Sequence, residues 1–397
     1  MNKSLKIAIY SGEIPSSTFI ERLVNGLSNS NISIYLFGAK YKTINYATSV
    51  KVVAYRHNKL SKLLHFLKYN LLLFLFRNED KKKLDRIIVD LYGNNLYSKV
   101  KSYPVLWHRP DVLHVQWAKS LEEWVWVKEF NIRLVLSLRG AHINYSPVAD
   151  EALADSYRQS FPKVDAFHAV SWAIANEAQR YGAKKDLIKV IYSGLNLQAN
   201  SFSKSNSIFK IVSVGRPHWV KGYHYALDAC NLLVSRGVDF HYEIIGGNSD
   251  IELLYHLSDL NLTNHVHLED NLPFDKVKTK IQSADLLLLP SLKEGVPNVV
   301  LEAMALGTLV LTTSCGGISE VITDNYNGFL IPIRDSKKMA DVIMEILQLP
   351  NSRVEKIIEA AKKTIKLQHT EKQMIESMVA LYHSVLTNNA IENDEVI

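Results

Sequence analysis

The chain has 397 residues, of which 47% are hydrophobic and 22% are charged. At about 100–200 residues per domain, this length predicts two domains, and the composition excludes disordered, collagen-like and disulfide-framework proteins. The net charge of +6 is uneven, because residues 1–200 carry 28 Lys and Arg against 16 Asp and Glu (+12) and residues 201–397 carry 18 against 24 (−6). The change of sign supports two domains, and a basic half can meet nucleic acid, an anionic membrane or an anionic substrate.

Cysteine usage and apolar runs bear on the compartment. Cys230 and Cys315 are too few for a disulfide framework or a metal quartet, and they fit a reducing compartment. Residues 1–6 lead into a short apolar strand without the pattern of a signal peptide. The longest apolar cluster, residues 71–76, is far shorter than the roughly 20 residues of a membrane span. We therefore expect a cytoplasmic protein.

Short β-rich runs alternate with helical patterns along the first half of the chain. Residues 5–10 predict a strand that ends at a loop formed by Ser11-Gly12, followed by a helix at 19–27 and a strand at 32–37. Further strands are predicted at 112–115, 132–138, 166–170 and 188–192, with helices at 150–161 and 174–181. Apolar strands joined by helical crossovers indicate a parallel sheet covered on both faces.

A second series of the same kind follows residues 196–206, a Ser- and Asn-rich stretch that we interpret as a linker. Its strands are predicted at 209–214, 240–245, 265–268, 285–289, 308–312 and 328–331, and residues 336–388 have a helical pattern.

The expected fold class is therefore α/β, with two Rossmann-like doubly wound parallel-sheet domains facing each other across a cleft, where such folds bind ligands. The expected domains are residues 1–200 and 201–370. Residues 371–397 are expected to form a C-terminal helix that packs back on the first domain, with an acidic tail at 390–397.

The most specific stretch runs from Pro290 to Gly307. Pro297 suits a first helical turn and Gly307 a helix end, so a helix is predicted over 297–306, with Glu294 in the preceding loop and Glu302 inside the helix. The amides at the helix start, with the helix dipole, form a site for an anion or a polarised sugar hydroxyl. The alternative is that Glu302 is an ordinary solvent-facing helix residue.

A second constellation, Gly215-Arg216-Pro217-His218-Trp219-Val220-Lys221-Gly222, directly follows the first strand of the second domain. A strand, a Gly-bearing loop and two cations five positions apart suit a diphosphate, because Arg grips oxygens with its fork and Lys adds a mobile point charge. The alternative is a solvated basic turn.

Together these motifs resemble family 4 of the nucleotide-sugar-dependent glycosyltransferases (glycosyl transferases group 1), retaining enzymes of the GT-B fold. The matching pieces, over residues 209–332, are Gly215-Arg216 with Lys221-Gly222, Ile245-Gly246-Gly247, Ser283-Ala284-Asp285, Pro290-Ser291 with Glu294-Gly295, Pro297-Asn298, Glu302-Ala303-Met304-Ala305 with Gly307, Gly316-Gly317 with Glu320, and Asn327-Gly328. Their common order is far more specific than any single piece.

The resemblance implies that Arg216, Lys221 and Glu294 are the catalytic residues. The two cations would bind the donor diphosphate and stabilise the leaving nucleotide, Glu294 would hold hydroxyls of the donor sugar, and Glu302 would accept from the ribose. The implied donor-binding residues are Gly12, Gly215, Gly295, Val296, Pro297, Asn298, Val299 and Glu302. The implied reaction is hexosyl transfer with retention, from a nucleotide-diphosphate sugar to a saccharide or lipid-linked saccharide in surface polysaccharide or glycan synthesis.

The first domain resembles the family more loosely. Gly12-Glu13 with Thr18-Phe19-Ile20 is similar to the glycine loop after the first strand, where Gly12 lets the backbone approach the diphosphate. Where many relatives carry Leu-His-Gly, this chain has Leu138-Arg139-Gly140, with His142 two residues beyond. Arg139 and His142 are both candidates for facing the acceptor or the transferred sugar, and the sequence leaves the choice open.

Several motifs of other enzymes are missing. The sequence contains no Asp-x-Asp pair of the kind that holds Mg²⁺ or Mn²⁺ in the other large glycosyltransferase fold, so we expect no metal and no cofactor besides the donor substrate. No Gly-x-Gly-x-x-Gly follows a strand, which argues against a nicotinamide dehydrogenase. His-Glu-x-x-His and Gly-x-Ser-x-Gly are also missing, which removes support for a zinc protease or a serine hydrolase.

Residues 56–86 carry nine basic and three acidic residues around Leu, Phe and Tyr. Such an amphipathic segment could lie on an anionic leaflet at the inner face of the plasma membrane and so reach a lipid-linked acceptor. The alternative is an internal helix whose apolar side packs on the first sheet. Similarly, Trp107, Trp117, Trp124 and Trp126 could stack on acceptor sugars, although core packing is the more usual role.

Two other functions remain open at this point. A nucleotide-sugar epimerase of similar shape would bind the same nucleotide but form its product without an acceptor. A non-catalytic nucleotide-sugar-binding protein would keep the fold, but the presence of all of Arg216, Lys221, Glu294 and Glu302 gives no sign of such decay. We expect no nucleic-acid partner, because the basic charge is confined to one half of the chain and no set of stacking aromatic residues accompanies it.

Overall fold

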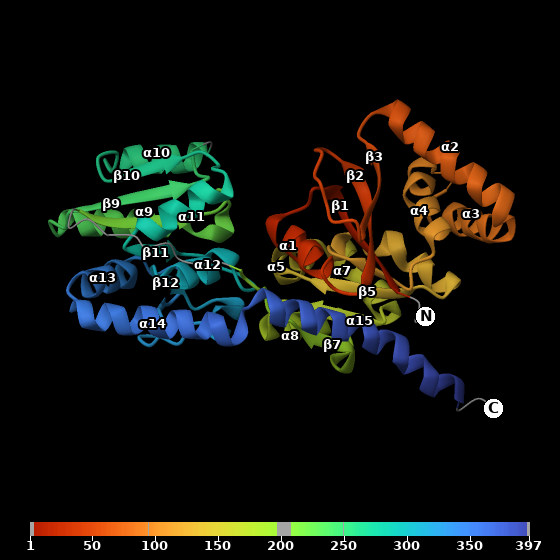
Figure 1. Ribbon diagram of the computed structural model, residues 1–397. Coiled ribbons are helices and arrows are strands. Elements are labelled where there is room, and N and C mark those ends of the chain that lie inside the picture. The colour runs from red at the N-terminus through yellow and green to blue at the C-terminus, as the bar shows by residue number, and fades with distance from the viewer. Residues whose placement is uncertain (1–3, 94, 197–207, 249, 395–397) are drawn as a thin grey trace. The chain divides into compact units, whose positions relative to one another are not determined.

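The computed structural model describes residues 4–93, 95–196, 208–248 and 250–394, with side chains up to residue 387. The chain divides into two compact units, one formed by Met1–Ile191 with Lys372–Ile397 and the other by Tyr192–Glu371 (Figure 1). Each unit is a parallel sheet flanked by helices, which confirms the predicted pair of Rossmann-like domains. Apart from Asn196, the predicted linker lies outside the described residues.

The first unit contains a seven-stranded sheet in the order β3-β2-β1-β4-β5-β6-β7, with every pair parallel. Its strands are β1 (Leu5–Ile14), β2 (Ile32–Lys40), β3 (Val50–Arg56), β4 (Val112–Val115), β5 (Arg133–Leu138), β6 (Ala166–Ala169) and β7 (Ile188–Val190). Its helices are α1 (Thr18–Leu27), α2 (Lys59–Phe76), α3 (Asn78–Tyr92), α4 (Leu96–His108), α5 (Gly140–Asn144), α6 (Ser146–Ala149), α7 (Glu151–Ser160) and α8 (Trp172–Gln179). Short 3₁₀ helices lie at Ala118–Ser120, Glu122–Phe130, Phe161–Lys163 and Lys185–Leu187.

The second unit repeats this plan with six parallel strands in the order β10-β9-β8-β11-β12-β13. Its strands are β8 (Phe209–Val214), β9 (Phe240–Ile245), β10 (Val266–Glu269), β11 (Leu286–Leu289), β12 (Leu309–Thr313) and β13 (Phe329–Ile331). Its helices are α9 (Tyr223–Ser235), α10 (Ile251–Asp259), α11 (Phe274–Ser283), α12 (Asn298–Leu306), α13 (Ser336–Leu347) and α14 (Asn351–Gln368), with 3₁₀ turns at Trp219–Lys221 and Gly316–Glu320.

Strand order reverses once in each sheet. In the first unit the reversal lies between β1 and β4, and in the second it lies between β8 and β11, which pair directly. In open parallel sheets the connections on the two sides of this switch point lead to opposite faces, which opens a crevice beyond the carboxyl ends of the strands. The loops after β8 and β11 therefore occupy the usual ligand-binding position of the second unit.

Helix α15 (Glu371–Asp394) belongs to the first unit although it follows the second in sequence. Met378, Leu381 and Tyr382 are buried with Ile7, Ile9 and Val112 in one apolar cluster. This cluster lies on one side of the first sheet, so the last helix completes a core begun by the first strand.

The structure corrects two predicted boundaries. Strand β1 does not end at Ser11-Gly12 but continues to Ile14, because Gly12 adopts a φ of +85° and forms a bulge at which Ser11 has no cross-strand partner in β2. Helix α12 begins at Asn298, so Pro297 is its N-cap rather than its first residue. Strand β3 was not predicted.

Several side chains settle alternatives that the sequence left open. Trp124 and Trp126 are buried in the core of the first unit, so for these two the packing role is confirmed.

Cys230 and Cys315 are both buried and free. Among the residues that the structure describes, no helix has the length and hydropathy that crossing a bilayer requires.

Candidate active site

The predicted site residues of the second unit gather at its switch point. The loop after β8 carries Gly215 and Lys221, and the loop after β11 carries Ser291 and Glu294. Because β8 and β11 are paired, residues that are 73 positions apart in sequence come into contact. A parallel strand pair at the point of reversal is therefore what brings the two motifs together.

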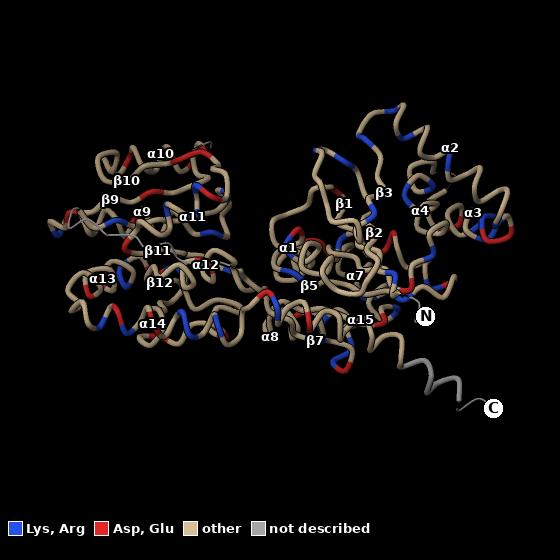
Figure 2. The backbone as a smooth tube through the Cα atoms, viewed as in Figure 1, with Lys and Arg blue, Asp and Glu red and all other residues tan. Residues whose placement is uncertain are grey.

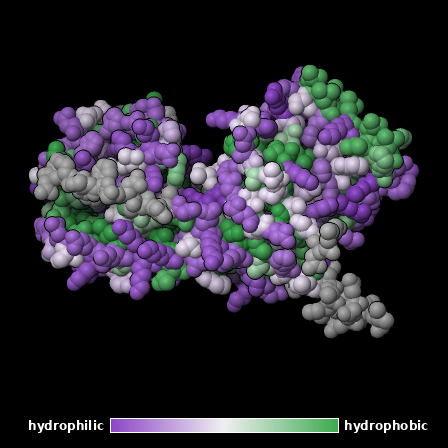
Figure 3. Space-filling view, in the orientation of Figure 1, coloured by the Kyte–Doolittle hydropathy of each residue, from purple (hydrophilic) through white to green (hydrophobic). Residues whose placement is uncertain are grey.

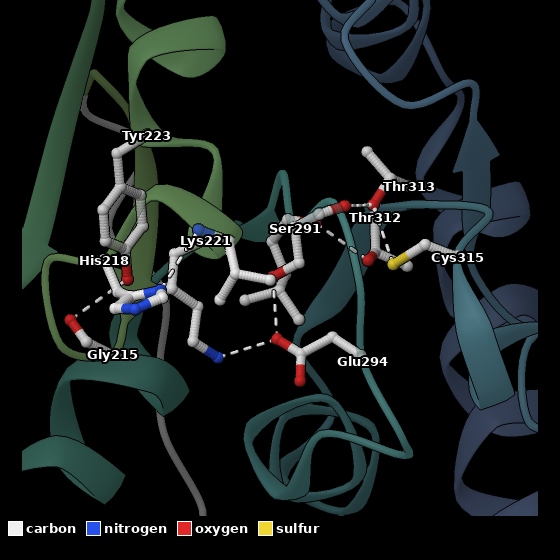
Figure 4. A network of polar contacts seen from close by, with 11 residues as sticks. Gly215, His218, Lys221, Tyr223, Ser291, Glu294, Thr312, Thr313 and Cys315 are labelled. Atoms are coloured by element: carbon white, nitrogen blue, oxygen red, sulfur yellow. Dashed lines mark hydrogen bonds and ion pairs between the residues drawn. The ribbon is translucent and has the colours of Figure 1, made fainter. Parts of the chain in front are cut away.

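Glu294 is the centre of a polar cluster at this place (Figure 4). Its Oε1 accepts a hydrogen bond from Lys221 Nζ at 2.8 Å and another from Ser291 Oγ at 2.8 Å. The Lys221 and Glu294 side chains are only 21% and 15% exposed. In such partial burial the pair is screened less by water and salt than a surface ion pair would be.

Glycine backbones allow the loops to approach closely enough for this pair to form. Gly222 has a φ of +66°, and a Cβ on it would clash with the carbonyl oxygen of Pro290. The same contact is reinforced by a hydrogen bond from Leu292 N to Val220 O at 2.7 Å. The turn at Gly222 thus places Lys221 next to Glu294, and only glycine adopts this turn without strain.

A second glycine turn supports Glu294 from the loop after β12. Gly316 has a φ of +56°, and a Cβ there would clash with the carbonyl oxygen of Glu294, while Gly317 N donates to Gly295 O at 2.9 Å. Thr313 Oγ1 donates to the carbonyl oxygen of Ser291. The Glu294 loop is therefore held on both sides by backbone contacts.

The start of α12 adds two further oxygen-bearing side chains. The amide oxygen Oδ1 of Asn298 is buried and has no hydrogen-bond partner among the described residues. Glu302 lies one turn further along and is 9% exposed, so the solvent-facing alternative for this residue is wrong. A buried acceptor left without a donor costs about 1–3 kcal/mol, which makes Asn298 a position where a ligand hydroxyl would be stabilising. Gly295, Val296, Pro297 and Val299 lie in the same loop and first helical turn.

Arg216 differs from Lys221. Its side chain is exposed, and it forms no ion pair with the residues that the structure describes. Gly215 lies close beneath the Lys221 stem, since a Cβ on it would be 3.2 Å from Lys221 Cε. The structure thus places one predicted cation in a fixed pair and leaves the other at the surface of the same loop.

Two ionisable neighbours of the cluster are kept neutral by burial. Burial, with a smaller contribution from Glu294, raises the pKa of Tyr223, whose hydroxyl donates to Gly215 O at 3.2 Å. Burial raises the pKa of the Cys315 thiol to about 11, so this thiol is protonated at neutral pH. Cys315 is therefore not a nucleophile of the thiolate type.

The candidates of the first unit lie at the carboxyl edge of its own sheet. Arg139 directly follows β5, donates from Nη2 to Gln116 Oε1 at 3.0 Å and lies over the Phe19 ring, 4.5 Å from its centroid. Burial lowers the pKa of its guanidinium to about 9. His142 packs against Trp117 with 5.2 Å between ring centroids, and burial followed by the charge of Lys119 lowers its pKa to about 4.

These two side chains are incompletely paired. Arg139 Nε and His142 Nδ1 are buried and have no hydrogen-bond partner among the described residues. Gly12 lies at the bulge of β1, with open space where a Cβ would be. The structure therefore keeps both Arg139 and His142 as candidates and does not choose between them.

Three features of the second-unit site were not assigned a role from the sequence. Ser291 donates to Glu294, and the backbones of Gly222 and Gly316 position the two loops. All three lie inside pieces of the family pattern, namely Lys221-Gly222, Pro290-Ser291 and Gly316-Gly317, so this pattern was the available signal. Over the described part of the chain, no group of three or more His, Cys, Asp or Glu side chains is arranged to hold a metal ion.

Comparison with known proteins identifies family models that match both units of the chain. The family model described as Glycosyltransferase Family 4 matches residues 16–199, and the model described as Glycosyl transferases group 1 matches residues 198–364. An amylovoran biosynthesis glycosyltransferase of Erwinia amylovora is 27% identical over 247 residues, which are 60% of this chain and 60% of that protein.

A second relative is the N,N'-diacetylbacillosaminyl-diphospho-undecaprenol alpha-1,3-N-acetylgalactosaminyltransferase of Campylobacter jejuni. It is 26% identical over 247 residues, covering 58% of this chain and 64% of the relative. The chain thus spans less than two thirds of the length of these two relatives.

Solved structures share the fold over nearly the whole chain. A glycosyltransferase from Rickettsia africae superposes with a TM-score of 0.71 at 17% identity, covering 97% of this chain and 99% of that one. An Anabaena protein, HepE, solved in complex with UDP, gives a TM-score of 0.68 at 17% identity, covering 96% of this chain and 100% of that one. The two family models together match residues 16–364, and the chain belongs to the group 1 glycosyltransferases of family 4.

Proposed function

We propose that this protein transfers a sugar from a nucleoside-diphosphate sugar to a saccharide or lipid-linked saccharide acceptor, in the synthesis of a surface polysaccharide or glycan. The observation that carries the proposal is the partly buried pair of Lys221 and Glu294 at the switch point of the second unit. This position is where doubly wound sheets bind nucleotides, and the pair offers a cation for a phosphate beside a carboxylate for a hydroxyl.

Lys221 can serve the diphosphate without releasing Glu294. Its ammonium group has three N–H donors, and Glu294 and Lys221 share one contact of 2.8 Å. A diphosphate oxygen would take another donor, and the exposed guanidinium of Arg216 in the same loop would supply the second cation. Attraction between these cations and the charge that develops on the departing nucleotide is the main catalytic contribution that we assign to the protein.

Glu294, Asn298 and Glu302 would recognise hydroxyls of the donor. The unpartnered Oδ1 of Asn298 and the carboxylate of Glu294 supply acceptors for the transferred sugar. Glu302, buried one turn along α12, would accept from the ribose. At Asn298, a donor hydroxyl would supply the hydrogen bond that the buried Oδ1 lacks among the described residues.

The transfer itself exchanges one bond at the anomeric carbon for another. The bond from that carbon to the diphosphate oxygen breaks with its electron pair remaining on the nucleotide, and a bond to the acceptor oxygen forms on the same face. The acceptor's proton leaves with the diphosphate. Retention of configuration and a metal-independent mechanism are part of the proposal, as is a role for Arg139 or His142 in contacting the acceptor or the transferred sugar.

The names of two relatives support the proposed class of acceptor. One concerns amylovoran biosynthesis, and the other names a diphospho-undecaprenol sugar, which is a lipid-linked saccharide. We therefore propose that this protein acts in the cytoplasm, at the inner face of the plasma membrane.

Thermal denaturation with nucleotides tests the donor site. UDP is the first probe and GDP the second, each with and without an attached sugar, and a ligand at 100 times its Kd should add about 2.7 kcal/mol of stability. Lys221→Ala should abolish the shift, and Lys276→Ala, which removes an exposed Lys from α11, should keep it. A chain that none of these nucleotides stabilises does not have the proposed site.

The remaining alternatives separate by their products. Incubation of the bound nucleotide sugar without acceptor should leave the sugar unchanged, whereas an epimerase would convert it. Addition of a lipid-linked saccharide extract should then release the nucleoside diphosphate. Tight nucleotide binding without release under any acceptor would favour a non-catalytic binding protein.

A further inference from the structure

Helix α2 exposes an apolar face that nothing in the described chain covers. Its large side chains on this face are 47–67% exposed, and Figure 3 shows them as a green area over the place that Figure 1 labels α2. The residues are Leu60, Leu63, Leu64, Leu67, Leu71, Phe74 and Leu75, which we call the leucine stripe. We infer that the leucine stripe docks the protein on an anionic membrane surface, in a way that uses none of the proposed donor-site residues.

The stripe has the spacing of a single helix face. Its members follow one another at intervals of one, three or four residues over four turns, so at 100° per residue they span about a third of the helix circumference. An exposed apolar patch of this size and continuity is unusual on a soluble protein and marks an interaction surface.

The opposite face of α2 is firmly attached. Tyr69 and Leu73 are buried in the core of the first unit, and the Tyr69 hydroxyl lies 3.2 Å from His108 Nε2. At the end of the helix, Arg77 Nη1 donates to Leu106 O at 3.1 Å. Rotating the stripe inward would break these contacts, so the stripe cannot be buried by a small adjustment of the helix.

The charge around the stripe favours an anionic partner. Residues 22–78 contain no Asp or Glu, but they contain nine Lys and Arg. Lys59 and Lys68, both exposed, border the stripe on its two sides, and Figure 2 shows basic positions without acidic ones along α2. Lys side chains at such borders extend their ammonium groups toward lipid phosphates while their stems stay on apolar surface.

A basic hollow adjoins the start of the stripe. It has a volume of about 390 Å³ and is lined by Arg56, His65 and Lys68 together with Asn58 and Ser61, and by Leu60 and Leu64 of the stripe. The lining contains cations, an amide and a hydroxyl but no carboxylate. Such a lining suits the phosphate of a lipid headgroup whose acyl chains lie along the leucines.

A second copy of this chain is the less favourable occupant. A two-fold contact through the stripe would place the same helix, which carries Lys but no carboxylate, on both sides. Like charges facing one another oppose such a contact, whereas an anionic leaflet attracts each Lys or Arg near its surface. Helix α2, with 18 residues, would lie in the plane of the headgroups.

Vesicle flotation of the full chain, without any nucleotide, tests the docking surface. The wild-type chain should float with phosphatidylcholine vesicles that contain phosphatidylglycerol, and less with phosphatidylcholine alone. The triple variant Leu64→Gln, Leu67→Gln, Leu71→Gln should lower the partition coefficient at least about tenfold, because three exposed apolar groups are lost from the lipid contact. Lys68→Gln should lower it about fivefold, which corresponds to about 1 kcal/mol.

The matched control is Ile251→Gln with Tyr255→Gln, which changes exposed apolar residues of α10 in the second unit and should leave flotation unchanged. Thermal stabilisation by UDP should be the same in the triple variant and the wild type, so loss of docking is distinguishable from loss of the donor site. Failure of the wild-type chain to float, or equal flotation of the triple variant, overturns the inference. A wild-type dimer in sedimentation equilibrium that the triple variant converts to monomer, without vesicle binding, would assign the stripe to a second copy instead.

Discussion

The two units share a sheet plan but place different chemistry at their switch points. In the second unit, Lys221 is paired with a carboxylate, Glu294, and held there by glycine turns. In the first unit, Arg139 meets an amide, Gln116, and an aromatic ring, Phe19. The fold therefore fixes where a ligand can bind, and the loops decide which ligand it is.

The units also differ in their buried histidines. Burial lowers the pKa of His65, His108, His114, His142 and His168 in the first unit, whereas His369 is the one such histidine in the described part of the second. In the first unit, Ser137 Oγ lies 2.8 Å from His114 Nε2 and 2.9 Å from His168 Nδ1, inside the sheet. Lowering the pH should therefore destabilise the first unit more than the second.

The largest expected effect is on catalysis. Lys221→Ala should lower kcat/KM for sugar transfer by about 10²–10³-fold, because one preorganised cation is lost from the leaving diphosphate. Arg139→Ala should instead leave UDP binding intact and change the acceptor dependence, since Arg139 belongs to the first unit. Steady-state kinetics and UDP titration of both variants measure this difference. Loss of UDP binding in both variants would contradict the assignment of donor binding to the second unit alone.

The second expected effect is an acid-induced loss of stability in the first unit. Burial lowers the pKa of His168 to about 3 and that of His114 well below its usual value of 6.5, so both are neutral in the folded chain while the unfolded chain binds protons. The stabilising contribution is complete above about pH 6.5 and is lost as the pH falls from 6.5 toward 3. Each of the two should add a slope of about 1.4 kcal/mol per pH unit in that range.

Hydrogen exchange at pH 7.0 and pH 5.5, each corrected for intrinsic exchange rates, would read the two units separately. The first unit should lose protection more strongly than the second. His168→Gln removes one of the two titrating groups and should reduce the slope. An equal loss in both units would contradict the assignment.

The third effect concerns the turn that delivers Lys221. Gly222→Ala should destabilise the second unit by about 2 kcal/mol, since a side chain at a φ of +66° is strained and would clash with the carbonyl oxygen of Pro290. Gly237→Ala is the matched control, because Gly237 has a similar φ of +73° but open space around its Cβ position. Urea denaturation should show the larger loss for Gly222→Ala, and equal losses would mean that the contact with Pro290 adds nothing.

The smallest effect is on the attachment of α15. Tyr382→Phe removes a hydroxyl that lies 2.8 Å from His114 Nδ1, and it should cost about 1 kcal/mol. The control is Tyr242→Phe, which removes an equally buried hydroxyl 2.8 Å from Ser213 Oγ in the second unit. Limited proteolysis should release the α15 region faster in Tyr382→Phe and not in Tyr242→Phe. Equal cleavage would mean that the hydroxyl contact does not hold the helix.

Buried strands were the most predictable part of this fold. The boundaries of β4, β8 and β9 were predicted to the residue, since each is a short, mostly apolar run with β-branched residues that is bounded by loop residues. Strand β3 was missed because Val50–Arg56 lies at the sheet edge, where exposed Lys51 and Arg56 interrupt the apolar pattern. The end of β1 was predicted too early, at Gly12, because a glycine with positive φ can form a bulge inside a strand as well as a turn after it.

The site was predictable as a set of residues but not as a geometry. The sequence motifs identified Lys221 and Glu294 as separate candidates. Their contact becomes visible only in the structure, where β8 pairs with β11. The burial of Glu302 and the unpartnered oxygen of Asn298 likewise depend on packing around α12, which local sequence does not specify. The leucine stripe was visible as apolar residues, but exposure is a property of the folded chain.

The return of α15 to the first unit has a consequence for how the chain is made. During synthesis the first unit emerges from the ribosome early, yet the groups that cover Ile7, Ile9 and Val112 arrive only with Met378, Leu381 and Tyr382. The second unit, continuous from Tyr192 to Glu371, can complete its core first. The unit that is synthesised before the other is therefore the later one to complete its core, because α15 must emerge before Ile7, Ile9 and Val112 are covered.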